Sequence, residues 1–177
     1  MTKQVVAVLG GTGQQGGGVV DALLSAGKFA VRVASRNPAG EAARALAARG
    51  VEVVKADLLD PGSLRSALAG AHGAFIVTNF WDPAQMPRET EIGTAAVQAA
   101  RAAGVNHLIW STLPDCEKLT GGRLKVAHFS GKARVDAAVE AVGFERHTFV
   151  MPPMYFQNFL TMMAPGPGRH AAHGTRR

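Results

Sequence analysis

The chain has 177 residues, of which 47% are hydrophobic, and its formal net charge at pH 7 is +6. This length and this apolar fraction are those of one globular domain with a substantial core. No apolar run reaches the roughly 20 residues of a membrane-spanning helix, and the first residues lack a signal-peptide core. Cys116 is the only cysteine, which excludes an intramolecular disulfide, so we expect a cytoplasmic protein without a membrane partner.

The positive charge does not predict a nucleic-acid partner. Arg169, Arg176 and Arg177 lie within the last nine residues, and the remaining excess is scattered without a dense Lys/Arg run. No DNA-binding motif is recognisable either. We therefore interpret the charge as solvated surface.

Strand and helix patterns alternate from the first residues onward. Short apolar runs predict strands at Val5–Leu9, Ala30–Ser35, Val51–Lys55, Gly73–Thr78, His107–Ser111 and His147–Met151. Helical segments are predicted at Gly17–Ala26, Glu41–Arg49, Pro61–Ala69, Pro87–Ala103 and Lys132–Ala141. This alternation is typical of a parallel sheet covered on both faces, and right-handed crossovers make it a doubly wound α/β domain, the Rossmann fold. The expected strand order is 3-2-1-4-5-6.

Two segments depart from the alternation. Pro114–Phe129 is a long connection after the fifth strand, and long loops in compact domains are often functional. Ala164–Arg177 is rich in Gly, Pro, Ala, His and Arg and contains no large apolar residue. We therefore predict a domain over residues 1–160 and a disordered tail over 161–177, in which His170 and His173 are not ligands.

A glycine-rich turn follows the first strand directly. Its glycines allow a tight turn, bring backbone N–H groups close to a ligand and leave a helix N-terminus facing a pyrophosphate. The alternative is a structural turn, but the strand before it and the helix after it favour dinucleotide binding. The predicted binding residues are Gly10, Gly11, Thr12, Gly13, Gln14, Gln15 and Gly16.

The end of the second strand predicts which dinucleotide is preferred. NAD-dependent dehydrogenases place an Asp or Glu there, whereas this chain has Ser35-Arg36-Asn37-Pro38, and the next acidic residue after this strand is Glu41. The guanidinium of Arg36 suits a 2′-phosphate, and Ser35 and Asn37 add hydrogen-bond donors. We therefore predict NADP(H) as the cofactor and NAD as less favoured. The alternative for Arg36 is a surface arginine in a turn.

Five segments in order resemble the NmrA-like family of atypical short-chain dehydrogenase/reductase relatives, and within it the HSCARG-like branch. They are VLGGTGQQGGGVVDALL, VRVASRNP, FIVTNFWDP, LTGGRLKVAHFSGK and MYFQNFL. The resemblance extends from Val5 to about Leu160. It implies NADP(H) binding together with redox sensing through a regulatory protein partner, or with reduction of quinones and other small molecules. Members have a second, smaller lobe after the sixth strand. This chain stops there, so we expect a truncated or frame-shifted product that lacks the lobe, with an open apolar surface that favours a homodimer.

The resemblance also implies further cofactor contacts. Asp57 and Leu58 would cover the adenine, although Asp57 could equally cap a turn. Thr78, Asn79 and Phe80 after the fourth strand would line the ribose and pyrophosphate, with plain packing of Phe80 and Trp81 as the alternative. A later segment would pack against the nicotinamide end, with an aromatic-rich loop leading into a helix as the alternative; it comprises Tyr155, Phe156, Gln157 and Asn158.

Catalytic short-chain dehydrogenases carry a Tyr-x-x-x-Lys pair on a helix, and the corresponding pair in this chain is His128-x-x-x-Lys132. Lys132 keeps the cofactor-holding role that the resemblance implies. Imidazole can transfer protons near neutral pH, which makes His128 a catalytic candidate beside Lys132 and Ser111. The favoured interpretation of His128 is nevertheless a structural histidine at a helix start. The incomplete set argues against efficient dehydrogenase chemistry, and together with the resemblance it implies a redox-sensing module with little or no dehydrogenase activity. The alternative is an NADPH-dependent oxidoreductase. No Cys/His cluster has metal-ligand spacing, and we predict no metal site.

Overall fold

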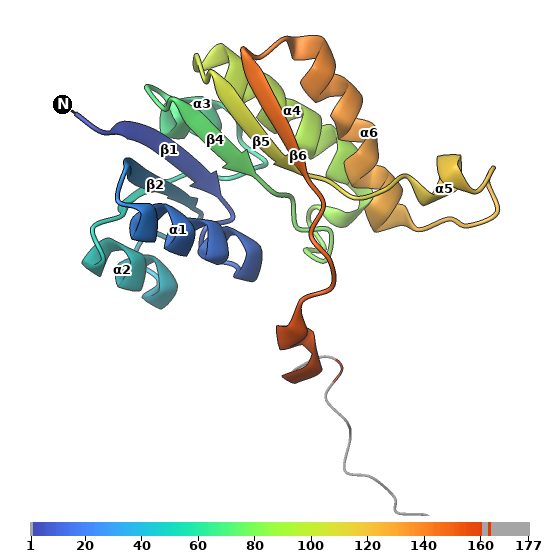
Figure 1. The fold of residues 1–177 in the computed structure, drawn as a ribbon, viewed down its shortest axis with the longest axis horizontal. Coiled ribbons are helices and arrows are strands. Elements are labelled where there is room, and N and C mark those ends of the chain that lie inside the picture. The colour runs from blue at the N-terminus through green and yellow to red at the C-terminus, as the bar shows by residue number, and fades with distance from the viewer. Residues whose placement is uncertain (1, 161–162, 164–177) are drawn as a thin grey trace, which may run out of the picture.

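The computed structural model describes residues 2–160 and 163, so the predicted tail lies outside the described residues except for Met163. Six parallel strands form one sheet in the order β3-β2-β1-β4-β5-β6, which confirms the predicted topology (Figure 1). The strands are β1 (Gln4–Leu9), β2 (Phe29–Ser35), β3 (Glu52–Lys55), β4 (Gly73–Ile76), β5 (His107–Ser111) and β6 (Arg146–Val150).

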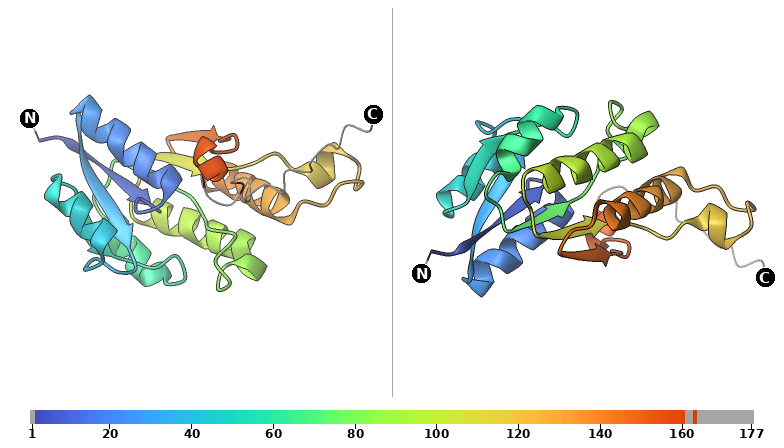
Figure 2. Two further views of the ribbon diagram at one scale, coloured as in Figure 1. Left: turned by 90° about the horizontal axis from the view of Figure 1, so that it is seen from below. Right: turned by 90° about the horizontal axis from the view of Figure 1, so that it is seen from above.

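Helices cover the sheet from two sides, as in a doubly wound fold (Figure 2). They are α1 (Gln14–Ala26), α2 (Glu41–Ala48), α3 (Pro61–Leu68), α4 (Glu89–Ala102), α5 (Cys116–Leu119) and α6 (Ala127–Val142). Two 3₁₀ turns, η1 (Met86–Arg88) and η2 (Phe156–Leu160), precede α4 and follow β6.

The core has two parts because successive side chains of a strand point to opposite faces of the sheet. Ala7 and Leu9 of β1 pack in a cluster with α3, α4 and α6, whereas Val8 packs with α1 and α2. Trp110 of β5 is completely buried in the first cluster. The central strands β1 and β4 are therefore apolar on both faces, as parallel strands under helices require.

Several element boundaries differ from the predicted ones. Helix α1 begins at Gln14 rather than Gly17, because close packing of the glycine loop continues into the helix. Helix α6 begins at Ala127 rather than Lys132, and it places His128 inside the helix. Strand β4 ends at Ile76, so Thr78 leaves the sheet and its hydroxyl instead donates to Glu89. The predicted long connection after β5 contains the short helix α5.

Within the described part of the chain, no helix has the length and the apolar character needed to cross a membrane.

Candidate functional site

The glycine loop between β1 and α1 has a backbone that larger residues cannot adopt. Gly10 has φ +80°, and its carbonyl accepts a hydrogen bond from the Gly13 N–H at 2.9 Å. A Cβ on Gly16 would lie only 2.2 Å from that same carbonyl oxygen. Glycine is therefore required at Gly16 for the first turn of α1 to pack against the end of β1.

The N-terminus of α1 is suited to an anion. Its N-cap is Gly13, which has no side chain to accept hydrogen bonds from the first-turn N–H groups, and the first turn carries no acidic side chain. Such N–H groups at the positive end of a helix dipole attract phosphate. Thr12, Gln14 and Gln15 belong to this loop and turn, so the predicted pyrophosphate-binding segment forms a continuous unit.

Gln15 links three segments that are far apart in sequence. Its side-chain Nε2 donates to Ser111 Oγ at the end of β5 at 2.9 Å, and its Oε1 accepts from the Tyr155 hydroxyl at 3.0 Å. Burial raises the pKa of Tyr155, so the phenol stays protonated. The structure thus brings together three predicted site residues whose direct connection the sequence did not indicate.

Arg36 lies at the carboxyl end of β2, as predicted, but its guanidinium has a partner that the sequence did not suggest. Arg36 Nη1 donates to Asp82 Oδ2 at 2.8 Å. The neighbouring Ser35 hydroxyl accepts a hydrogen bond from the backbone N–H of Asn37 at 3.2 Å. The side chain of Arg36 is 60% exposed, so the guanidinium remains accessible to a ligand.

Lys132 lies in a buried polar cluster with Glu89 and Thr78. Its Nζ donates to Glu89 Oε1 at 2.6 Å, to Thr78 Oγ1 at 2.7 Å and to the Thr78 carbonyl at 2.8 Å. These three contacts match the three N–H donors of an ammonium group. Burial lowers the pKa of Lys132, while the carboxylate of Glu89 opposes this effect. Glu89 was not among the predicted site residues.

The second carboxylate oxygen of this cluster accepts no hydrogen bond from the part of the chain that the structure describes. Glu89 Oε2 is buried and has no partner among the described residues. A Cβ on Gly131 would lie 3.1 Å from it, so the chain of α6 passes close by. The cluster therefore joins the end of β4 to α4 and α6 at close range.

Asp57 and Leu58, predicted to cover the adenine, make contacts within the protein. Asp57 Oδ1 accepts from the Leu59 N–H at 3.0 Å, which is the turn-capping contact that the sequence left open. Leu58 packs against the larger core cluster. Neither contact requires a ligand.

An aromatic cluster surrounds His128 beside the end of β4. Its ring centroid lies 5.4 Å from that of Phe80, 5.3 Å from that of Trp81 and 4.8 Å from that of Phe129. Asn79, the predicted residue before Phe80, accepts a hydrogen bond from the Trp81 N–H at 3.2 Å through its side chain. Packing among aromatic rings is a structural role for His128. The same rings form an apolar wall beside the carboxyl end of β4.

The segment after β6 extends away from the sheet (Figure 1). Tyr155 holds it to Gln15, and the Asn158 N–H donates to the Tyr155 carbonyl at 3.0 Å. Phe156 is 85% exposed, and Gln157 is also exposed in η2. The four predicted residues of this segment therefore do not form one surface against the sheet.

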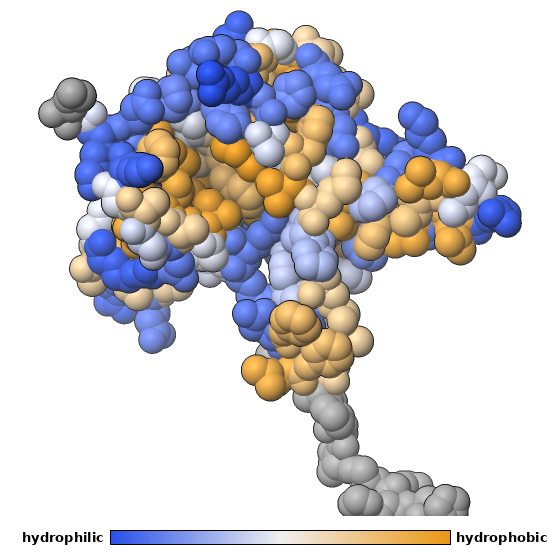
Figure 3. Space-filling view, viewed as in Figure 1, coloured by the Kyte–Doolittle hydropathy of each residue, from blue (hydrophilic) through white to orange (hydrophobic). Residues whose placement is uncertain are grey.

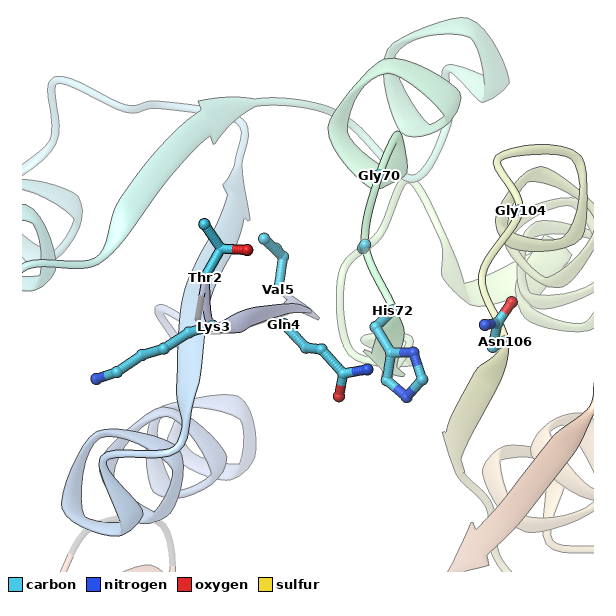
Figure 4. A pocket seen from close by; sticks show the side chains of 9 residues that line it. Thr2, Lys3, Gln4, Val5, Gly70, His72, Gly104 and Asn106 are labelled. Atoms are coloured by element: carbon cyan, nitrogen blue, oxygen red, sulfur yellow. The ribbon is translucent and has the colours of Figure 1, made fainter.

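A separate cavity of about 330 Å³ lies at the opposite edge, where the strands begin (Figure 4). Lys3, Gln4, His72 and Asn106 contribute to its lining. Open α/β sheets bind ligands at the carboxyl ends of their strands. This cavity is therefore distinct from the candidate site.

The glycine loop and Arg36 lie at the carboxyl ends of strands in a sheet of Rossmann topology, and this chain is similar to known proteins in sequence and in fold. The model of the NmrA-like family matches residues 2–174. An NmrA-like family domain-containing oxidoreductase, FrzB from a Cladobotryum species, is 38% identical over 161 residues, which cover 88% of this chain and 48% of that protein. The chain spans about half the length of the curated relatives it matches.

Solved structures show the same relationship. NmrA, a negative transcriptional regulator, superposes with a TM-score of 0.77 at 30% identity, covering 89% of this chain and 48% of NmrA. NmrA has been solved in complex with NADP and with NAD. An NADPH-dependent quinone oxidoreductase from Escherichia coli, complexed with NADPH, gives a TM-score of 0.69 at 26% identity over 88% of this chain and 51% of that one. The chain belongs to the NmrA-like family.

Proposed function

We propose that this chain binds NADP(H) at the carboxyl edge of its sheet and acts as a redox-sensing regulatory module with weak or absent dehydrogenase activity. The observation that carries the proposal is the uncapped N-terminus of α1 behind the close-packed glycine loop, together with Arg36 at the end of β2. A pyrophosphate fits the first feature and a 2′-phosphate fits the second. NmrA, which is known with both NADP and NAD, is a regulator.

The residues of α6 favour sensing over catalysis. His128 stands where a catalytic tyrosine would be, and it packs among aromatic rings. The N–H donors of Lys132 are directed at Glu89 and Thr78. Efficient dehydrogenase chemistry couples hydride transfer to proton transfer by an acid group held near the reacting atoms. A module of this kind would transmit the redox state of the cofactor to a protein partner. We place it in the cytoplasm because its one cysteine suits a reducing compartment.

The second candidate is an NADPH-dependent oxidoreductase that resembles quinone reductases. The hydrogen-bonded group of Ser111, Gln15 and Tyr155 favours it, since this group places a protonated phenol beside the glycine loop. A similar quinone oxidoreductase and the oxidoreductase FrzB support this alternative. We also infer the HSCARG-like branch from the same five segments that carry the resemblance to the family, from VLGGTGQQGGGVVDALL to MYFQNFL.

Calorimetric titration with NADP⁺, NADPH, NAD⁺ and NADH tests the binding proposal. A bidentate charge-assisted contact is worth roughly 1.5–3 kcal/mol, and the lower end is appropriate for an exposed side chain. We therefore expect Arg36→Ala to weaken NADP⁺ binding about tenfold and to leave NAD⁺ binding nearly unchanged. Equal losses for the two dinucleotides would show that Arg36 does not contact the 2′-phosphate.

A steady-state assay of NADPH oxidation with a panel of quinones separates the two candidate functions. The regulatory proposal predicts little or no turnover at saturating NADPH. Rapid turnover that Tyr155→Phe abolishes would instead establish the oxidoreductase.

A further inference from the structure

Asp82 connects two loops at the carboxyl edge of the sheet. It follows β4, whereas its partner Arg36 follows β2, 46 residues earlier in the chain. Because both loops border the edge where this fold binds dinucleotides, a carboxylate stands directly beside the predicted 2′-phosphate contact.

The carboxylate is the fixed partner in this ion pair. Asp82 Oδ1 accepts from the Ala84 N–H at 3.0 Å, and its backbone carbonyl accepts from the N–H groups of Gln85 and Met86 at 2.8 and 2.9 Å. The side chain of Asp82 is 13% exposed, compared with 60% for Arg36. Asp82 therefore cannot withdraw from the site without opening its own loop, whereas the arginine is free to adjust.

The carboxylate is also charged at neutral pH. The Ala84 N–H, and after it Arg36, hold the pKa of Asp82 below its ordinary value against the opposing effect of burial. A permanent negative charge thus lies next to the guanidinium.

We propose that Asp82 is a specificity-determining residue that weakens the binding of 2′-phosphorylated dinucleotides and leaves NAD(H) unaffected. This inference rests on the proposed function. Asp82 contacts Nη1, and no other described residue contacts Nε or Nη2 of Arg36, which leaves these two groups for a phosphate. A bound 2′-phosphate then shares one guanidinium with a fixed carboxylate, and the two anions repel each other. Asp82 therefore tunes the choice between the dinucleotides without closing the site to either.

The test measures dissociation constants for NADP⁺ and NAD⁺ by calorimetry in the full chain. Asp82→Asn removes the charge and retains an oxygen that can accept the Ala84 N–H. We expect it to tighten NADP⁺ binding about three- to tenfold and to leave NAD⁺ binding within about twofold. The matched control is Asp21→Asn, which removes the same charge from the exposed pair between Asp21 on α1 and Arg49, the residue that follows α2. Asp82→Ser, whose hydroxyl can also accept the Ala84 N–H, repeats the test if the first variant melts at a lower temperature.

Three results overturn the inference. NADP⁺ binding that weakens would mean that Asp82 positions Arg36, and a gain no larger than that of Asp21→Asn would be a net-charge effect. A gain that persists undiminished in an Arg36→Ala background would show that the pair is irrelevant. If the unmodified chain binds neither dinucleotide, the proposed function fails instead.

Discussion

At the scale of single residues, one backbone oxygen determines what can occupy the third glycine of the loop. The carbonyl oxygen of Gly10 would lie 2.2 Å from a Cβ at Gly16, and the carbonyl carbon 2.5 Å from it. Backbone atoms cannot rotate away as the end of a long side chain can. Gly18 lies two residues further along α1, and a Cβ added there would have no heavy atom of another described element within 4 Å. These two glycines of the same helix thus have opposite steric surroundings.

We therefore predict opposite effects of alanine at these positions. Gly16→Ala should lower the free energy of unfolding by about 1–3 kcal/mol, as overpacking does, and should abolish dinucleotide binding. Gly18→Ala should raise the free energy of unfolding by about 0.5–1 kcal/mol, because alanine is the better helix former. Urea denaturation monitored by circular dichroism measures both. Similar unfolding midpoints for the two variants would contradict the steric account.

Sequence spacing could locate the glycine loop because its residues are contiguous. It could not find Asp82 as the partner of Arg36, since the pair spans 46 residues and depends on the path of two loops. Glu89 was missed for a different reason. An acidic residue in the first turn of a helix is ordinarily explained by the helix dipole and expected to be exposed, whereas Glu89 is 3% exposed.

At the scale of elements, the cluster of Thr78, Glu89 and Lys132 holds three of them together. Thr78 follows β4, Glu89 begins α4, and Lys132 lies on α6. The two charged side chains are 3% and 10% exposed, so each depends on the other for compensation of its charge. The ion pair therefore fixes where α4 and α6 meet the end of β4.

Lys132→Met should consequently destabilise the fold. It leaves the carboxylate of Glu89 buried without a counter-charge, which costs about 3–5 kcal/mol. Lys132→Met combined with Glu89→Leu should recover most of this loss, because apolar side chains of similar volume can replace a buried pair. The control is Glu91→Gln in the exposed Arg88–Glu91 pair, for which we expect about 0–1 kcal/mol. Chemical denaturation gives all three values. Equal, small losses for Lys132→Met and Glu91→Gln would show that the buried pair has no special role.

The order of the strands was predictable, whereas two helix starts were not. Alternating strands and helices with right-handed crossovers leave few topologies open. The run Gly16-Gly17-Gly18 has low helix propensity, yet α1 begins before it because tertiary packing outweighs propensity. Helix α6 begins at Ala127, where its Phe129 and Ser130 N–H groups both bond the carbonyl of Val126, and Val126 is not a typical capping residue.

At the scale of the whole molecule, apolar side chains gather on the last described part of the chain. Figure 3 shows them over η2 and on the sheet face beside α1. Strand β6 is the last strand of the sheet and is largely exposed. Among the described residues, the large apolar side chains exposed on or after β6 are Val150, Met151, Met154, Phe156, Phe159, Leu160 and Met163. Exposed apolar side chains next to the outer strand of a sheet favour association.

We therefore predict that the purified chain binds NADP⁺ and self-associates. Sedimentation and light scattering should show dimers or larger species whose fraction rises with protein concentration. Serine at both Phe156 and Leu160, which are 85% and 82% exposed, should shift the distribution toward monomers without changing the unfolding midpoint, because neither side chain contributes to the core. Leu119→Ser is the matched control, since Leu119 is 74% exposed but lies on α5, away from this surface. A monodisperse monomer at every concentration would refute the prediction. If Leu119→Ser shifts the distribution equally, a general loss of exposed apolar surface explains the change. The contact would then not be specific to η2.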